Sequence, residues 1–183
     1  LFDGLLESAV TCQTCGTPSL TRDRYMDLSL DIYADHIHTL DDALFEFTKS
    51  ETLSGDNKVL CEKCETKRPA TKELRLATAP SVLVCHLKRF AFDKYGEVTR
   101  IGKKVQFPLR LEIGDFMSRV NKARPPPYEL VAVLVHRGQS CEHGHYIAFV
   151  KKHGEWYKCN DSQVTQVDLS MVLQQQAYIL MYE

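Results

Sequence analysis

A histidine and an asparagine on neighbouring segments are the side chains of this sequence best suited to acid–base chemistry. His145 stands in Gly144-His145-Tyr146, and Asn160 stands near the end of Trp156-Tyr157-Lys158-Cys159-Asn160-Asp161-Ser162. In a thiol-based active site, a histidine removes the proton of a cysteine, while an Asn or Asp accepts the ring N–H and fixes the tautomer. Asn160 is the first candidate for that acceptor, and Asp161 could take the same role or act through water. Taken alone, such a pair is more often a structural histidine with a satisfied hydrogen bond.

No cysteine accompanies this pair as a convincing nucleophile. Cys85 lies within the apolar run 82–87 and is expected to be a buried small hydrophobe. Cys159 precedes Asn160 on the same expected strand, so its side chain should point to the opposite face. Cys141 is the accessible candidate, but it lies in a loop beside Glu142, whereas reactive thiolates of this class favour a helix N-terminus. We therefore expect the sulfur to come from outside these residues.

The other four cysteines form two Cys-x-x-Cys pairs, Cys12/Cys15 and Cys61/Cys64. Each pair places two thiolates at the end of a tight turn, and two such turns brought together give the four-sulfur shell that zinc prefers. The long intervening segment suggests that each pair lies at the tip of its own hairpin. Two disulfides or unrelated buried thiols are the alternative, and a redox motif is weaker because its usual strand–helix context is missing. A four-thiolate site has no open position, so the zinc would be structural.

The remaining pattern predicts the elements that must position these residues. Thr39 and Asp42 resemble a capping box for a helix carrying Leu40, Ala43, Leu44 and Phe47, and Asp168 is expected to cap a short helix carrying Leu169, Val172 and Leu173. Apolar runs predict strands at 26–32, 74–76, 82–87, 105–108, 130–135, 146–150, 155–158 and 177–182. Turns are expected at 54–57, 95–96 and 153–154, and a surface loop at 114–127. Many strands with few helices predict an α+β domain around an antiparallel sheet.

Composition limits the class of protein. The chain has 183 residues, of which 44% are hydrophobic, enough for one core and one domain. Its 23 Lys and Arg residues nearly balance 24 Asp and Glu residues, so neither nucleic acid nor an anionic membrane is expected as a partner. There is no apolar run long enough to span a bilayer and no signal pattern. Seven cysteines, an odd number, favour a reducing compartment, nucleus or cytoplasm. The first residue is Leu rather than Met, so we expect a fragment or a processed piece.

Several motifs together resemble the ubiquitin-specific protease (USP) family of cysteine deubiquitinases. They occur in the family's order and cover nearly all of the chain. The motifs are Phe2-Asp3-Gly4 with the first cysteine pair, Tyr25 to Ile32, the second cysteine pair, Leu87-Lys88-Arg89-Phe90, Gly144-His145-Tyr146 with Trp156-Tyr157 and Asn160-Asp161-Ser162, and Gln176 to Tyr182. One part of the family pattern is absent from this sequence, namely the N-terminal thumb with its cysteine box and oxyanion-hole donor.

The resemblance implies a partial catalytic domain of the papain-like superfamily. It implies an antiparallel-sheet palm at approximately 81–183 and zinc-clamped β-hairpin fingers at approximately 8–80. It makes His145 the general base, Asn160 its orienting residue and Asp161 an accessory. Gly144 and Tyr146, with the loops 114–127 and 137–143, are expected beside the ubiquitin tail. The implied ligands of a structural zinc ion (Zn2+) are Cys12, Cys15, Cys61 and Cys64.

The leading functional hypothesis is therefore the C-terminal part of a deubiquitinating thiol protease. Its partners would be ubiquitin or a ubiquitinated protein, and the missing thumb segment of the same enzyme, whose cysteine would attack the bond after the ubiquitin C-terminal glycine. This chain alone is expected to be inactive. A non-catalytic ubiquitin-binding zinc module is the alternative, and a zinc-stabilised scaffold without a ubiquitin role is a third. Retention of both His145 and Asn160 favours the enzyme, because a pure binding module has no need of that pair.

Overall fold

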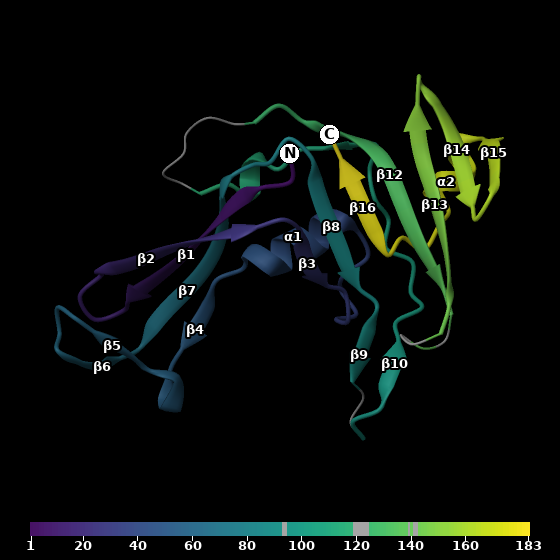
Figure 1. Ribbon diagram of the computed structural model, residues 1–183. Coiled ribbons are helices and arrows are strands. Elements are labelled where there is room, and N and C mark those ends of the chain that lie inside the picture. The colour runs from purple at the N-terminus through teal and green to yellow at the C-terminus, as the bar shows by residue number, and fades with distance from the viewer. Residues whose placement is uncertain (93–94, 119–124, 139, 141–142) are drawn as a thin grey trace.

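Two mainly antiparallel sheets joined by one helix make up most of the molecule in the computed structural model (Figure 1). The structure describes residues 1–92, 95–118, 125–138, 140 and 143–183. The four-stranded sheet extends away from the eight-stranded sheet, and the two chain termini lie near each other at one edge of the molecule (Figure 1). Few helices and mostly antiparallel strands confirm the α+β prediction.

The four-stranded sheet has the order β2-β1-β7-β4, and all its pairs are antiparallel. Its strands are β1 (Gly4–Cys12), β2 (Pro18–Tyr25), β4 (Glu51–Leu53) and β7 (Ala70–Thr78). A 3₁₀ turn at Gly55–Asn57 leads from β4 to a separate hairpin, β5 (Val59–Cys61) with β6 (Thr66–Arg68). β2 is exposed along all but its last residue, so it shows no apolar alternation that could predict it from the sequence.

The eight-stranded sheet runs β15-β14-β13-β12-β16-β8-β3, with β11 paired to β12 beside this path. Its strands are β3 (Leu28–Asp31), β8 (Leu83–Lys88), β11 (Arg110–Leu111), β12 (Tyr128–Arg137), β13 (His145–Lys152), β14 (Glu155–Asn160), β15 (Gln163–Val167) and β16 (Ile179–Tyr182). The pair of β3 and β8 is parallel, and the others are antiparallel. Cys85 on β8 is completely buried, as the sequence predicted.

A two-stranded hairpin, β9 (Phe90–Phe92) with β10 (Val98–Arg100), projects beyond the end of β8 (Figure 1). Arg89 fixes its base. The buried guanidinium of Arg89 donates to the carbonyl oxygens of Ala177, Ile101 and Lys103 at 2.6–2.9 Å. One side chain therefore ties the end of β8 to the segments that follow β10 and precede β16.

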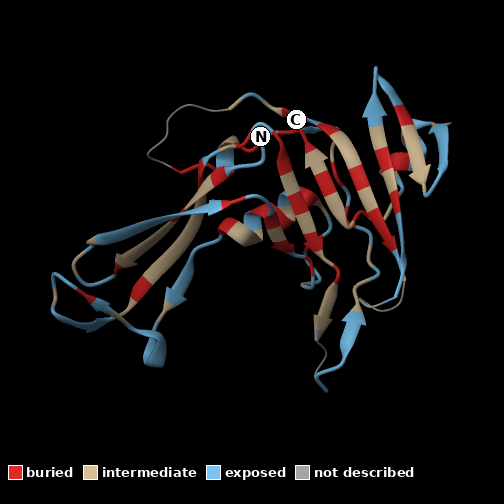
Figure 2. Ribbon diagram, viewed as in Figure 1, coloured by how far each residue is buried: buried red, intermediate tan, exposed pale blue. Residues whose placement is uncertain are grey.

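Helix α1 (Leu40–Thr48) packs against both β3 and β7, and so against both sheets. The predicted capping box is confirmed, because Thr39 Oγ1 accepts from the Asp42 N–H at 3.1 Å and the Asp42 carboxylate accepts from the Thr39 N–H at 2.8 Å. The helix buries Leu40, Ala43 and Leu44 in the single core (Figure 2). Helix α2 (Leu169–Leu173) follows Asp168 as predicted, but the Asp168 side chain makes no capping hydrogen bond.

The strand predicted at 105–108 was wrong, and the surface loop predicted at 114–127 was wrong at residues 114–118, whereas residues 125–127 form no helix or strand, as expected of a loop. Residues 105–108 form no strand and make one bridge, Thr39 to Gln106. Val105 and Phe107 are buried in the core, so their alternation reflects packing rather than a sheet ladder. Within 114–127, the described residues 114–118 are not a surface loop, because a 3₁₀ turn at Gly114–Phe116 (η2) is followed by buried residues up to Ser118. Residues 119–124 lie outside the described part of the chain.

The carboxylate of Glu7 on β1 fixes the segment 114–118 to the four-stranded sheet. Glu7 is almost fully buried, and it accepts hydrogen bonds from Ser118 Oγ at 2.5 Å and from Arg22 Nη2 at 2.7 Å. These two bonds, the one to Ser118 having the larger effect, lower the pKa of Glu7 below its usual value near 4.5. The segment 114–118 is thus fastened to the four-stranded sheet.

Among the described residues, no helix is both long and apolar enough to cross a bilayer.

Candidate active site and cysteine cluster

The hairpin of β13 and β14 brings the predicted base and its orienter together. The turn is at His153-Gly154, as the sequence predicted, and both residues have positive φ (52° and 87°). Two left-handed central residues are typical of a type I′ turn, whose twist matches that of the flanking strands. This turn sets the register Ala148↔Cys159, so the first residue of β13, His145, and the last residue of β14 lie at the same end of the hairpin.

His145 Nε2 lies 2.5 Å from Asn160 Oδ1, and Asp161 Oδ2 is farther away, at 3.9 Å. Because an amide oxygen only accepts, Nε2 must carry the hydrogen, and in the neutral ring Nδ1 then has the lone pair. Of the two orienters that the sequence left open, Asn160 therefore makes the direct contact. Asp161 has a positive φ of 51°, and its charge lies on the same side of the ring. The His145 side chain is 46% exposed, so the imidazole lies at the surface, where a reacting group can approach it.

The neighbours of His145 form an open edge. Gly144 and Tyr146 are both exposed. The Tyr146 ring packs on the buried ring of His136, with 4.7 Å between centroids, and the His136 ring also meets the edge of Phe90 at 5.4 Å. Nothing in the residue pattern singles out His136, because it directly follows an apolar run.

The cysteines of the described residues offer no nucleophile at His145. Cys85 is buried in β8, and Cys159 pairs with Ala148, its side chain on the face of β14 opposite to Asn160 by strand alternation. Cys141 lies outside the described residues.

The four remaining cysteines converge at the tips of two hairpins. Their sulfur atoms all lie within 4.8 Å of one another, and those of Cys15 and Cys61, which are 46 residues apart, are separated by 3.6 Å. As predicted, each pair lies at its own hairpin tip, between β1 and β2 and between β5 and β6. The two turns repeat one geometry. Gly16 N–H donates to the Cys12 carbonyl at 2.9 Å and Glu65 N–H to the Cys61 carbonyl at 2.8 Å, and both Gly16 and Glu65 have positive φ.

The donor set fits zinc. Four sulfurs about 2.3 Å from a zinc ion are about 3.8 Å apart in a regular tetrahedron, close to the distances found here. Hydrogen bonding with Thr17 lowers the pKa of Cys15 to about 6, whereas the neighbouring Cys15 sulfur raises the pKa of Cys64 to about 12. The cluster is compatible with a zinc site.

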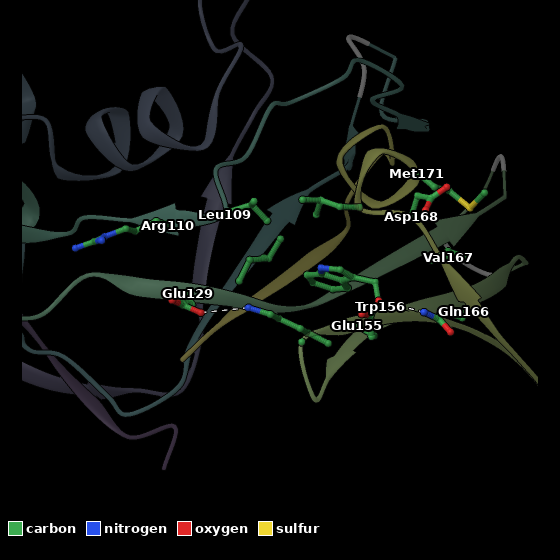
Figure 3. A pocket seen from close by; sticks show the side chains of 13 residues that line it. Leu109, Arg110, Glu129, Glu155, Trp156, Gln166, Val167, Asp168 and Met171 are labelled. Carbon is green, nitrogen blue, oxygen red and sulfur yellow. Dashed lines mark hydrogen bonds and ion pairs between the residues drawn. The ribbon is translucent and has the colours of Figure 1, made fainter.

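A hollow of about 720 Å³ lies elsewhere, at the far end of β13 (Figure 3). Trp156 lines it, as do two polar pairs, Lys151 with Glu129 and Gln166 with Glu155. Lys151 is six residues from His145 along the strand, roughly 20 Å at about 3.3 Å per residue. None of the predicted site residues lines this hollow, so its size does not mark it as the reaction centre.

The family model described as "Ubiquitin carboxyl-terminal hydrolase" matches residues 1–182. The mouse ubiquitin carboxyl-terminal hydrolase 17-like protein C is 40% identical over the whole chain, which covers 32% of that relative, and the human ubiquitin carboxyl-terminal hydrolase 17-like protein 13 is 42% identical, with 33% covered. The chain thus spans about a third of the length of the curated relatives it matches.

Solved structures of deubiquitinase (DUB) modules also match this chain. The SAGA Ubp8/Sgf11/Sus1/Sgf73 DUB module bound to ubiquitin aldehyde contains a chain that matches all of this one with a TM-score of 0.89 and 36% identity. A structure of the SAGA DUB module with a variant Ubp8, bound to monoubiquitin, matches with a TM-score of 0.90 and 38% identity. This chain covers 41% and 40% of those chains, respectively.

Proposed function

Since the chain belongs to the ubiquitin carboxyl-terminal hydrolase family, we propose that it is the fingers-and-palm part of a deubiquitinating thiol protease, with His145 as general base. The observation that carries this proposal is the 2.5 Å contact between His145 Nε2 and Asn160 Oδ1. That contact gives the ring the tautomer and orientation that a thiol protease requires of its base.

The proposed reaction uses His145 Nδ1 twice. It removes the proton of a cysteine thiol, and the thiolate attacks the carbonyl carbon of the ubiquitin C-terminal glycine. When the C–N bond breaks, the imidazolium returns the proton to the leaving amine, and a thioester remains. His145 then removes a proton from water, which attacks the thioester carbonyl, and the cysteine leaves as a thiol carrying that proton. Asn160 holds the ring throughout, and Asp161, whose Oδ2 lies 3.9 Å from Nε2, is the accessory residue on the same side of the ring.

The cysteine itself is proposed to come from a segment outside this chain. The described cysteines lie in the cluster, in the core, or on the face of β14 away from Asn160. The relatives are about three times as long as this chain, which leaves room for such a segment. On this proposal, the chain by itself does not hydrolyse ubiquitin conjugates.

A structural zinc ion is proposed at Cys12, Cys15, Cys61 and Cys64, where it would cross-link two hairpins and leave no coordination position open for chemistry. We further propose that the fingers occupy approximately 8–80 and the palm approximately 81–183. β3, although it lies in the first of these segments, pairs with β8 in the larger sheet.

We propose ubiquitin or a ubiquitinated protein as the partner, with Gly144 and Tyr146 beside the ubiquitin tail. Two of the similar solved structures hold ubiquitin aldehyde or monoubiquitin, which supports this choice. We place the protein in a reducing compartment, nucleus or cytoplasm. The six cysteines among the described residues all have free thiols, which is consistent with that choice.

The test uses the full-length protein that contains this chain and a ubiquitin–fluorophore substrate. His145→Ala should abolish hydrolysis, because the thiol then has no base. The matched control is His36→Ala, since His36 is also an exposed histidine bonded to an oxygen acceptor, Glu46, at 3.2 Å. That variant should keep the activity of the unmodified protein.

A ubiquitin probe with a C-terminal electrophile identifies the nucleophile. We expect mass spectrometry to find the probe on a cysteine outside this chain. Labelling of Cys141 would overturn the proposed origin of the sulfur. Tight ubiquitin binding with neither labelling nor hydrolysis would refute the enzyme proposal and favour a non-catalytic ubiquitin-binding zinc module.

A further inference from the structure

His136 is a buried histidine directly behind the candidate active site. It lies near the end of β12, opposite Tyr146 on β13, and only 2% of its surface is exposed. Its Nδ1 is buried and has no hydrogen-bond partner among the described residues. A buried polar atom without a partner calls for a reason why the ring is held in this place. The contacts of the His136 ring with its neighbours supply one.

The ring occupies the space that a side chain at residue 144 would need. A Cβ added to Gly144 would lie 2.5 Å from His136 Cε1 and 2.9 Å from Cδ2, and closer still to Nε2. A Cβ added to Gly138 would lie 2.9 Å from His136 Cε1 and 2.9 Å from the Gly144 Cα. Separations this short do not occur between real Cβ atoms and their neighbours. Gly138 and Gly144 therefore pack directly against the His136 ring, and neither position has room for a side chain.

This packing constrains the residue before His145. Glycine has the greatest backbone freedom of all residues, so Gly144 would otherwise be a hinge next to the catalytic ring. The His136 ring forms one wall of that hinge, and it is itself held by Tyr146 and Phe90. In addition, Arg137 pairs with His145 across the sheet. The direction in which His145 leaves the backbone is therefore set partly by His136.

We propose that His136 is a positioning residue, whose ring holds Gly144 so that His145 stays within reach of Asn160 and of the thiol. This rests on the proposed function, because it assigns a role within the same site. The role is steric. His136 does not touch the reacting atoms and exchanges no proton in the reaction. A displacement of about 1 Å at a reacting group can lower a rate by about a hundredfold, so removing the His136 ring should have a measurable effect on the reaction rate.

The kinetic test combines two substitutions in the full-length protein with the ubiquitin–fluorophore substrate. Gly144→Ala should lower kcat/KM by about a hundredfold, because its methyl group meets the ring. His136→Ala should lower kcat by about tenfold or more and change KM little. In the double variant the methyl group no longer meets a ring, so its kcat/KM should match that of His136→Ala within about threefold. If the double variant is as inactive as Gly144→Ala, Gly144 is required for another reason, such as substrate approach, and the proposal fails.

Two matched controls separate this role from general packing. Gly102→Ala makes the same substitution where the added Cβ has only an ordinary contact at 3.8 Å, so activity should be unchanged. The rings of His136 and His86 both contact the Tyr178 ring, with 6.0 and 4.7 Å between centroids, but His86 does not face Gly144, so His86→Ala is the matched control. A loss in His86→Ala equal to that in His136→Ala would overturn the positioning role.

A second readout does not depend on activity. In protein labelled with ¹⁵N-histidine, NMR reports which nitrogen of His145 carries the hydrogen. We expect the Nε2–H tautomer in the unmodified protein and a mixture of tautomers in His136→Ala, and an unchanged tautomer would refute the proposal. If the unmodified protein does not hydrolyse ubiquitin conjugates, the proposed function fails, while the NMR comparison still decides the role of His136.

Discussion

Removing a metal ion from the four-cysteine cluster should unfold the hairpin tips and leave the eight-stranded sheet folded. The hairpin of β5 and β6 spans Val59 to Arg68, and Cys61 is its one buried residue in the two strands. Fixing a backbone costs roughly 1–2 kcal/mol per residue, so ordering these ten residues costs roughly 10–20 kcal/mol. A buried apolar side chain returns only about 1.5–3 kcal/mol. Zinc held by four thiolates contributes about 10–16 kcal/mol, which is comparable to the cost of ordering the hairpin.

The assay is hydrogen exchange followed by mass spectrometry, with and without a strong chelator. After chelation, peptides from 11–18 and 59–68 should exchange within about tenfold of the rate of an unfolded chain, because their opening free energy approaches zero. Peptides from β12 and β16 should not change, because these strands are in the core of the other sheet.

A pair of cysteine variants provides the control. Cys64→Ser should reproduce the effect of the chelator, whereas Cys159→Ser changes an equally half-buried thiol outside the cluster and should have no effect. A structural metal at the cluster is refuted if native mass spectrometry finds no metal in the protein, or if exchange at the tips is the same with and without the chelator. Loss of protection in β12 and β16 would also refute it, since the metal would then support the whole fold.

Three further predictions follow from single contacts. Asn160→Ala should lower kcat of the full-length enzyme by about a hundredfold or more, because the His145 ring loses the partner that fixes its tautomer. KM should change little, because substrate binding is not affected, and a rise in KM with kcat unchanged in steady-state kinetics would contradict this role. Glu7→Gln should destabilise the fold at neutral pH, as measured by urea denaturation. Hydrogen bonds from Ser118 and Arg22 lower the folded-state pKa of Glu7 below about 4.5, so the stabilisation is complete above that pH and is lost as the pH falls through the folded pKa. The difference between the two proteins should therefore shrink below about pH 4.5, and a constant difference would contradict this account. Thr39→Ala removes the N-cap of α1 and should cost about 1 kcal/mol of unfolding free energy, and a change near zero in thermal or urea unfolding would contradict the role of the cap.

Local rules explain which elements could be predicted. The capping box fixes the start of α1, because its two hydrogen bonds join residues only three apart. The His153-Gly154 turn fixes the β13–β14 hairpin, and with it the nearness of His145 to Asn160, by the backbone conformation of two residues. The pairing of a base with an orienter was therefore contained in one short stretch of sequence, 145–160.

Long-range packing explains what could not be predicted. β3 pairs in parallel with β8, which is far from it in the sequence, and no local pattern encodes that choice. The run at 105–108 has the alternation of a strand but packs into the core as an irregular segment. β2 has no apolar alternation and becomes a strand because β1 offers it hydrogen-bonding groups.

The sequence by itself determined the chemistry of the site: a histidine with an amide partner, and four thiols in two tight turns. These are properties of residue type and short spacing, which turn geometry and hydrogen bonding decide within a few residues. Only the tertiary structure decided what surrounds them. It brought Cys15 within 3.6 Å of Cys61 and placed the ring of His136 against Gly144. Such contacts depend on how the whole chain buries its apolar surface, a free energy summed over all residues and not readable from any one segment.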